Sequence, residues 1–208
     1  MTEPGHLYII SAPSGTGKTT LVKNLVEVTP KITISISHTT RPKRSTEMHG
    51  VNYFFIDKTE FTRMTKAGDF LEYATIFNYL YGTSRHSVEN TLTRGLDVIL
   101  EIDWQGHQQI KTLFPETTSI FILPPSLEDL KQRLLKRQQD HPNIIEQRLS
   151  DVKETVSHIH EYDYVVINDD FSKALHDLKT IIEVGQFSSL RQTKQHYRLI
   201  AELCGERF

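Results

Sequence analysis

Apolar and polar residues along the 208-residue chain alternate between short strand patterns and amphipathic helix patterns. Five runs are apolar at consecutive positions, as expected of strands that are covered on both faces of a parallel sheet. They are "LYII" (7–10), "ITISI" (32–36), "DVILEI" (97–102), "SIFIL" (119–123) and "YVVIN" (164–168). Helical spacing of apolar residues follows the first run over 19–28 and the last run over 171–184. This alternation predicts an α/β fold built on a parallel sheet.

Two regions interrupt the alternation. Residues 37–96 are polar and rich in Arg and Tyr, with an aromatic patch at 53–55 and a helix expected near 57–67 that begins at Asp57. This region predicts a lobe inserted between strands of the main sheet. Residues 133–148 carry several cations around the polar stretch "QQDHPN", which indicates a mobile helical flap. The helix before it is expected to begin at Ser126, because Asp129 stands three residues later as in a capping box.

The segment after residue 185 has a loose seven-residue spacing of apolar side chains. These are Leu190, Tyr197, Ala201 and Cys204. The pattern fits a surface helix, which we favour, or a helix that pairs with a second chain.

Composition argues against several classes of protein. The chain has 24 basic and 26 acidic residues, a formal net charge of −2, which argues against binding nucleic acid or a membrane surface through bulk charge. Cys204 is the only cysteine, so a disulfide framework and a thiolate metal site within one chain are excluded. The first residues show no signal-peptide pattern, and no apolar stretch approaches the roughly 18 residues that a membrane helix needs. We expect a soluble, cytoplasmic protein.

The first strand runs into "SAPSGTGKTT", a near match to the phosphate-binding P-loop. Backbone N–H groups of such a loop point at phosphate oxygens, and the following helix adds partial positive charge. Gly15 and Gly17 allow close approach, Lys18 is expected to reach the β- and γ-phosphates of ATP, and the Thr19 hydroxyl is expected to ligate Mg²⁺. The first glycine of the usual pattern is replaced by Ala12, which adds one methyl group. The expected ATP-binding loop comprises Ala12, Pro13, Ser14, Gly15, Thr16, Gly17, Lys18, Thr19 and Thr20.

A second acidic element follows a buried strand in "VILEID" (98–103). Glu101 and Asp103 are two residues apart, so on a strand both side chains point to the same face. Beside a P-loop such acids serve near Mg²⁺ or near the phosphate acceptor, and the pattern leaves both roles open. The alternative is a strand-end acid exposed to solvent.

Together with the P-loop, several segments closely resemble the guanylate kinase family, in particular its bacterial members, over about residues 5–182. The segments are "SISHTTRPKR" (35–44), "GVNYFF" (50–55), "DFLEYA" (69–74), "YLYGTS" (79–84), "ILEIDWQG" (99–106), "LPPSLEDLKQRL" and "YVVINDD". The resemblance implies a P-loop NTPase fold with a five-stranded parallel sheet covered by helices, an inserted GMP-binding lobe and a helical lid. In a single domain, 1–208, we place the core at 5–36, 97–125 and 160–208, the lobe at 37–96 and the lid at 126–159. The implied reaction is ATP + GMP → ADP + GDP.

The resemblance also implies roles for residues of the lobe. The GMP-binding set is Ser37, Arg41, Arg44, Tyr53, Glu72, Tyr81, Thr83, Glu101 and Asp103. Arg41 and Arg44 are three apart and can converge on one dianionic phosphate. Glu72 would accept hydrogen bonds from guanine N1–H and the 2-amino group, while Thr83 meets O6. Adenine has neither donor and would leave the Glu72 carboxylate unpaired, which can reject it by on the order of 10⁴-fold.

For the transfer step the resemblance assigns Arg133 and Arg148 to the phosphates, and Arg137 to packing on adenine near Asn168. With these, the expected catalytic residues are Lys18, Arg41, Asp103, Arg133 and Arg148. The flap departs from the family pattern, because Lys136 and Gln138 replace glycines and Pro142 stiffens the turn and could start the next helix. We expect slower flap closure than in relatives; equal turnover after glycine is restored at 136 and 138 would contradict this.

Each residue taken alone has a simpler explanation. Tyr53 fits a core position, Arg41 and Arg44 fit a solvated pair, and Glu72 fits a surface acid. The basic flap residues fit a solvated helix face. His158 and His160, on a predicted helix, do not share a face and show no metal-binding spacing.

Three other functions compete with a guanylate kinase. A guanylate-kinase-like interaction module of scaffolding proteins typically lacks an intact P-loop. A kinase of a phosphorylated sugar does not need Glu72 and Thr83 together with the Arg and Tyr cage. A P-loop GTPase would need an N-K-x-D motif, which the sequence does not contain. We expect ATP and Mg²⁺ as cofactors, GMP as substrate, no nucleic-acid or membrane partner, and a monomer or homodimer.

Overall fold

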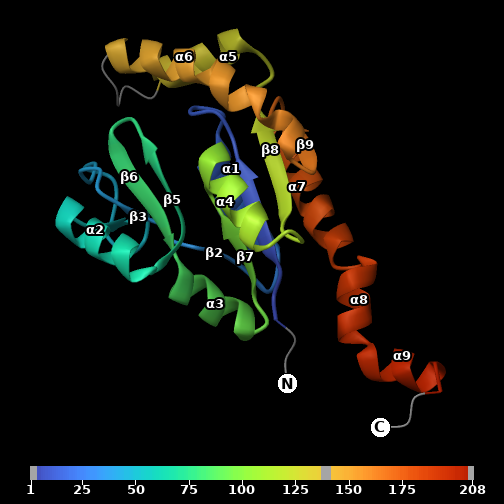
Figure 1. Ribbon diagram of the computed structural model, residues 1–208. Coiled ribbons are helices and arrows are strands. Elements are labelled where there is room, and N and C mark those ends of the chain that lie inside the picture. The colour runs from blue at the N-terminus through green and yellow to red at the C-terminus, as the bar shows by residue number, and fades with distance from the viewer. Residues whose placement is uncertain (1–3, 137–141, 206–208) are drawn as a thin grey trace.

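The structure is a computed structural model that describes residues 4–136 and 142–205, with only the backbone described for 142–148. Its centre is a five-stranded sheet in the order β2-β7-β1-β8-β9, in which all four neighbouring pairs are parallel (Figure 1). The strands are β1 (Leu7–Ser11), β2 (Ile32–Ile34), β7 (Asp97–Leu100), β8 (Thr118–Leu123) and β9 (Tyr164–Ile167). The predicted parallel sheet is confirmed, and so are its five strands to within two residues at each end.

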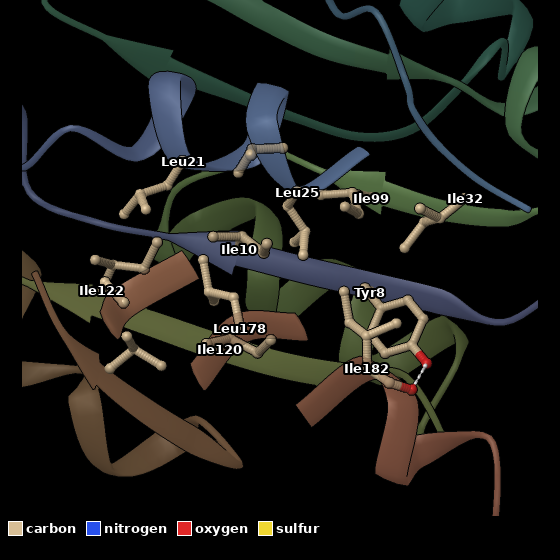
Figure 2. Close-up of a cluster of buried hydrophobic side chains, with 13 residues drawn as sticks. Tyr8, Ile10, Leu21, Leu25, Ile32, Ile99, Ile120, Ile122, Leu178 and Ile182 are labelled. Carbon is tan, nitrogen blue, oxygen red and sulfur yellow. Dashed lines mark hydrogen bonds between the residues drawn. The ribbon is translucent and has the colours of Figure 1, made fainter. Parts of the chain in front are cut away.

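Alternate residues of the central strand face two different helix layers, because successive side chains of a strand point to opposite faces. Tyr8 and Ile10 pack in a cluster with α1 (Lys18–Val28) and α7 (Phe171–Gly185). Figure 2 shows this cluster, in which Leu21, Leu25, Leu178 and Ile182 close over the strands. The Tyr8 hydroxyl donates to the Ile182 carbonyl over 3.4 Å (Figure 2).

The opposite face of the sheet is covered by other helices. Leu7 and Ile9 pack with Val88 of α3 (Arg85–Thr93) and Ile110 of α4 (Trp104–Leu113). Helices therefore lie on both faces, which explains why the strands read as continuous apolar runs.

A second, four-stranded sheet lies beside the main one, in the order β4-β3-β6-β5 (Figure 1). It consists of β3 (His38–Thr39), β4 (Phe54–Phe55), β5 (Phe70–Ile76) and β6 (Tyr79–Ser84), with α2 (Lys58–Ala67) in the same lobe. Helix α2 begins where the sequence predicts, because the Asp57 side chain accepts from the Glu60 N–H at 2.8 Å. The division into core, lobe and lid at the stated boundaries stays a prediction.

Helices α5 (Leu127–Lys136) and α6 (Pro142–Ser157) lie across the top of the molecule in Figure 1. The Ser126 hydroxyl caps α5 by accepting from the Asp129 N–H at 3.0 Å, as predicted. Pro142 is the first residue of α6, which agrees with the expectation that it starts a helix. Arg137 and Gln138 lie outside the described residues. Leu130 and Leu134 of α5 pack against Leu149 and Val152 of α6 in a small cluster of their own.

The expected placement of His158 and His160 needs correction. Helix α6 ends at Ser157, so His158 and His160 lie in a short 3₁₀ segment, η1 (Ile159–Glu161) and its cap, rather than on one helix. The His158 ring stacks on Trp104 with centroids 3.9 Å apart. The described residues contain no group of three His, Cys, Asp or Glu side chains that could hold a metal ion.

The C-terminal segment forms two short helices, α8 (Ser189–Gln195) and α9 (Tyr197–Leu203), that extend away from the sheet (Figure 1). The predicted seam does not form a single face: Leu190 and Tyr197 are exposed, Ala201 is buried, and Cys204 is exposed. Over the part of the chain that the structure describes, no helix combines the length and apolar character needed to cross a membrane.

Candidate active site

The loop after β1 has the backbone of an anion-binding nest. Gly15 and Gly17 have φ of 95° and 97°, a conformation that residues with a Cβ rarely adopt, and α1 begins immediately afterwards at Lys18. Space is limited too, because a Cβ on Gly15 would lie 2.8 Å from the Leu134 side chain. Ala12 does not have a positive φ and packs against the core cluster, so alanine fits where the usual pattern has glycine.

The other residues of the predicted loop run from the end of β1 into the first turn of α1. Pro13 and Thr16 are buried, Ser14 and Lys18 are half-buried, and Thr19 and Thr20 are exposed on the first turn of α1. The Thr16 carbonyl accepts from the Asn168 amide at 2.7 Å and from Arg133 Nη1 at 3.1 Å. Arg133 Nη2 also donates to the Asn168 carbonyl at 3.0 Å. Helix α5 and the residue after β9 therefore hold the P-loop backbone.

Lys18 lies within the electrostatic reach of three carboxylates from two other segments of the chain. Burial lowers the pKa of Lys18, while Glu101, Asp103 and Glu72 act in the opposite direction. Lys18 is far in sequence from Glu101 and Asp103, and the parallel sheet brings them to one end because β1 and β7 are neighbours with the same direction. Glu72 comes from β5 of the second sheet. The arrangement places one cation among several acids, beside a loop suited to phosphate.

Glu101 and Asp103 are positioned differently from the strand geometry expected. Strand β7 ends at Leu100, so neither residue is on a strand and the same-face argument does not apply. Glu101 Oε2 accepts from the Thr19 hydroxyl at 3.1 Å. Asp103 caps α4, with Oδ1 accepting from the Gly106 N–H at 3.0 Å. The two acids thus serve different neighbours, Glu101 the P-loop and Asp103 the start of α4.

The donor set near Thr19 suits Mg²⁺. A hydroxyl and a carboxylate are oxygen ligands, and Mg²⁺ usually combines one or two such groups with water and substrate phosphates. The contact between Thr19 and Glu101 brings both oxygens together at the first turn of α1, directly after the P-loop glycines. The residues present therefore fit a magnesium ion that is held mainly by the phosphates of a bound nucleotide.

Arg41 and Arg44 converge on one anionic group, as their spacing predicts, and in this structure that group is the Glu47 carboxylate. Arg41 Nη2 lies 2.6 Å from Glu47 Oε1, and the Arg44 N–H donates to Oε2 at 2.8 Å. The Arg44 guanidinium is 3.9 Å from the same carboxylate. The Arg41 hydrogen bond is a main reason that the pKa of Glu47 lies below its usual value despite the opposing effect of burial. A cluster that holds a carboxylate in this way can also bind another anion such as phosphate.

Two tyrosines flank this cluster. The Tyr53 and Tyr81 rings are 5.9 Å apart, and the Arg41 guanidinium lies 5.5 Å from the centre of the Tyr53 ring. Burial raises the pKa of Tyr53 to about 12, so its hydroxyl stays a neutral donor at neutral pH. Ser37 is tied to the same lobe, since its carbonyl accepts from the Phe54 N–H at 2.9 Å. Arg41, Arg44, Tyr53, Tyr81 and Ser37 all lie in the lobe that carries the second sheet.

Glu72 and Thr83 face each other across β5 and β6. The Thr83 hydroxyl donates to Glu72 Oε1 at 2.5 Å, and the two side chains belong to directly paired residues. Glu72 is 3% exposed and Thr83 is fully buried. Burial raises the pKa of Glu72 to about 7, against the lowering effect of the Thr83 hydrogen bond. A buried acid beside a hydroxyl, near Lys18, can recognise a ligand with adjacent N–H donors.

Of the other predicted site residues, Arg148 is on α6 and Arg137 lies outside the described residues. Only the backbone of Arg148 is described, so its contacts stay a prediction.

Sequence reasoning missed Glu47, Gly106 and Gln109. Glu47 stands three residues after Arg44, and an acid at that spacing in a basic stretch was a usable signal. Nothing in the sequence indicated that Gly106 and Gln109 of α4 contact β5, because this depends on which strand packs against α4. A Cβ on Gly106 would meet the Glu72 carboxylate, and the Gln109 amide bonds the Tyr73 backbone.

Three comparisons with known proteins agree. The family model "Guanylate kinase" matches residues 4–184. The chain is 52% identical to the guanylate kinase of Pseudomonas fluorescens over 201 residues, covering 97% of this chain and 98% of that protein. It is 54% identical to the guanylate kinase of Coxiella burnetii over 198 residues, covering 95% and 96%. A crystal structure of guanylate kinase from Anaplasma phagocytophilum superposes with a TM-score of 0.78 at 32% identity, covering 91% of this chain and 90% of that one.

Proposed function

The chain belongs to the guanylate kinase family, and we propose that the site described above transfers the γ-phosphoryl group of ATP to GMP, producing ADP and GDP. The Glu72–Thr83 pair is the observation that carries the choice of acceptor. A carboxylate accepts from guanine N1–H and the 2-amino group at once, and the Thr83 hydroxyl is next to it to meet O6. Adenine would leave the carboxylate without donors, which is costly for a buried group.

The acceptor phosphate is proposed to bind at the arginine cluster. Arg41 and Arg44 can give bidentate, charge-assisted hydrogen bonds to a dianionic phosphate, and their present partner is an anion, Glu47. Ser37, Tyr53 and Tyr81 add neutral donors on the same lobe. This arrangement holds GMP at two points, its base at Glu72 and its phosphate at the arginines.

The donor nucleotide is proposed to bind at the P-loop. Residues 12–20 hold the phosphates, Lys18 reaches the β- and γ-phosphates, and Asn168 and Arg137 flank the adenine. Mg²⁺, held at Thr19, would neutralise developing charge on the phosphates when bound. Glu101 and Asp103 act near Lys18. Arg41, Arg133 and Arg148 supply positive charge during transfer. Such transfer depends on positioning and electrostatics more than on covalent catalysis.

Arg133 supports this role through its position. It already lies at the P-loop, bonded to the Thr16 and Asn168 carbonyls. Closure of α5 and α6 over the donor would exclude water and limit hydrolysis of ATP. A monomer or homodimer, a cytoplasmic location and the absence of a nucleic-acid partner stay predictions from the sequence; sedimentation at several protein concentrations tests the first.

The decisive experiment is a coupled assay of ADP release with ATP and Mg²⁺, comparing GMP, AMP, UMP and no acceptor. We expect release with GMP alone and its loss in Lys18→Ala, because the lysine is the P-loop cation that reaches the phosphates. Folded protein that releases no ADP with any nucleoside monophosphate would overturn the proposal. A scaffold module or a sugar-phosphate kinase would then be the better explanation, and Glu72 would lose its role.

A further inference from the structure

The outer edge of strand β5 is paired with a side chain rather than with another strand. β5 is the last strand of its sheet, and the Tyr73 N–H donates to Gln109 Oε1 at 3.2 Å. The same amide returns a hydrogen bond, from Nε2 to the Tyr73 carbonyl at 2.9 Å. Its other bond goes from Nε2 to the Gln105 carbonyl on α4 itself, at 3.1 Å. The Gln109 amide therefore replaces a neighbouring strand at this point of the edge and is itself fixed in orientation.

Tyr73 directly follows Glu72, so this clamp fixes the backbone next to the buried acid. The same helix approaches the Glu72 side chain one turn earlier. A Cβ built on Gly106 would lie 2.5 Å from Glu72 Oε2 and 3.1 Å from its Cδ, closer than real side chains approach. Glycine at 106 is thus what leaves room for the carboxylate in its present place.

Helix α4 itself is rigidly placed. Asp103 caps its first turn, and Ile110 is fully buried in the cluster on the sheet face that α3 and α4 cover. Asp103, Gly106 and Gln109 follow at intervals of three residues, which brings them toward the same side of the helix. Helix α4 is thus capped by Asp103, a predicted site residue, and carries Gly106 and Gln109, which both contact β5 of the second sheet.

We propose that Gly106 and Gln109 are positioning residues for guanine recognition: they hold β5 so that the Glu72 carboxylate stands at a set distance from the phosphoryl donor at the P-loop. The inference rests on the proposed function, since it gives these residues a role in binding GMP. Neither residue needs to touch the nucleotide. A shift of Glu72 by about 1 Å is enough to cost on the order of 100-fold in such a site.

The first test replaces Gln109 by Ala. Loss of two hydrogen bonds to Tyr73 should raise the KM for GMP about tenfold, while kcat and the KM for ATP stay within about twofold. Gln108→Ala is the matched control, because that neighbouring side chain bonds Glu161 instead of β5 and should leave both KM values unchanged. A Gln109→Ala enzyme with the wild-type KM for GMP would overturn the inference. So would one in which the KM for ATP rises in proportion to that for GMP.

Gly106→Ala separates positioning from folding. Alanine favours the helix by about 1 kcal/mol relative to glycine, which offsets part of the cost of the new methyl group displacing Glu72. The variant should therefore stay folded, and thermal unfolding checks this. We expect kcat/KM for GMP to fall about 100-fold while the KM for ATP is unchanged. Unchanged use of GMP by Gly106→Ala would contradict the role of Gly106.

The two proposals can fail separately. If the wild-type protein does not use GMP, the proposed function is wrong and this inference falls with it. If the wild type uses GMP and the Gln109 and Gly106 variants match it, only the inference is wrong.

Discussion

At the scale of single residues, Glu72, the residue proposed to recognise the guanine base, is a buried acid with a raised pKa. Its pKa of about 7 comes from burial, and the Thr83 hydroxyl, which bonds the charged form, acts against that rise. Guanine offers two donors to this carboxylate and therefore binds its charged form best. GMP recognition should then depend on pH close to neutrality.

We expect kcat/KM for GMP to fall as the pH drops below about 7, approaching a tenfold loss per unit, because protonation of Glu72 removes the acceptor in the free enzyme. Thr83→Val removes a bond that favours the charged form and should move this midpoint upward. The GMP phosphate also titrates near pH 6. It does so equally for both enzymes, so the difference between the two pH profiles reports Glu72. Identical midpoints in the wild type and Thr83→Val would contradict this assignment.

At the scale of elements, helix α8 is attached to the sheet by one ion pair. Arg191 donates to both carboxylate oxygens of Asp97 over 3.2 Å, and to the Tyr8 hydroxyl over 3.3 Å. Asp97 lies at the start of β7 with a side chain only 7% exposed, and Oδ1 also accepts from the His6 N–H at 2.6 Å. The pair thus links the C-terminal helices to the edge of the core that lies away from the phosphate loop.

Arg191→Met should lower the free energy of unfolding by about 2 to 3 kcal/mol, below the cost of breaking a fully buried pair because the guanidinium is partly exposed. Urea unfolding at neutral pH measures this. Arg198→Met, at an exposed position on α9, is the control and should be nearly neutral. The GMP-dependent rate should be unaffected in both variants, and equal stability of the two would show that the ion pair does not anchor α8.

At the scale of the whole molecule, the two nucleotides are proposed to bind to different parts that meet at one end of the main sheet. The acceptor lobe carries Glu72 and the arginine cluster, while the P-loop and α5 form the donor side. Lys18 interacts electrostatically with acids of both parts: with Glu72 of the lobe, and with Glu101 and Asp103 after β7. Each ligand should therefore stabilise the protein through its own contacts.

GMP and ADP, which cannot react with each other by this transfer, should each raise the unfolding free energy by about 2.7 kcal/mol at 100 times its Kd. For a chain of this size that is a rise in Tm of about 5 to 10 °C. Glu72→Gln should abolish the shift with GMP and keep the shift with ADP. Thermal unfolding with each ligand tests this; loss of both shifts in Glu72→Gln would mean that the two sites are not separate.

Much of the fold and part of the site followed from local patterns. The strands, the P-loop glycines and the caps at Asp57 and Ser126 depend on neighbours within a few residues, and these predictions are confirmed. Strand β7 was predicted two residues too long, because Ile102 continues its apolar pattern while Asp103 already caps the next helix. The prediction that Leu190, Tyr197, Ala201 and Cys204 form one apolar seam was wrong. The helix is broken at His196, so Leu190 lies on α8 and the others follow on or after α9.

The sequence by itself determined the sheet, the phosphate loop and the family, since apolar periodicity, glycine conformation and motif spacing are local properties of the chain. Only the tertiary structure decided that Glu47 occupies the arginine cluster, that Gln109 completes the edge of β5 and that Gly106 makes room for Glu72. The last two are contacts between segments more than 30 residues apart, created when α4 packs against β5. Their strength depends on distances of a few tenths of an ångström, and no local pattern encodes such distances.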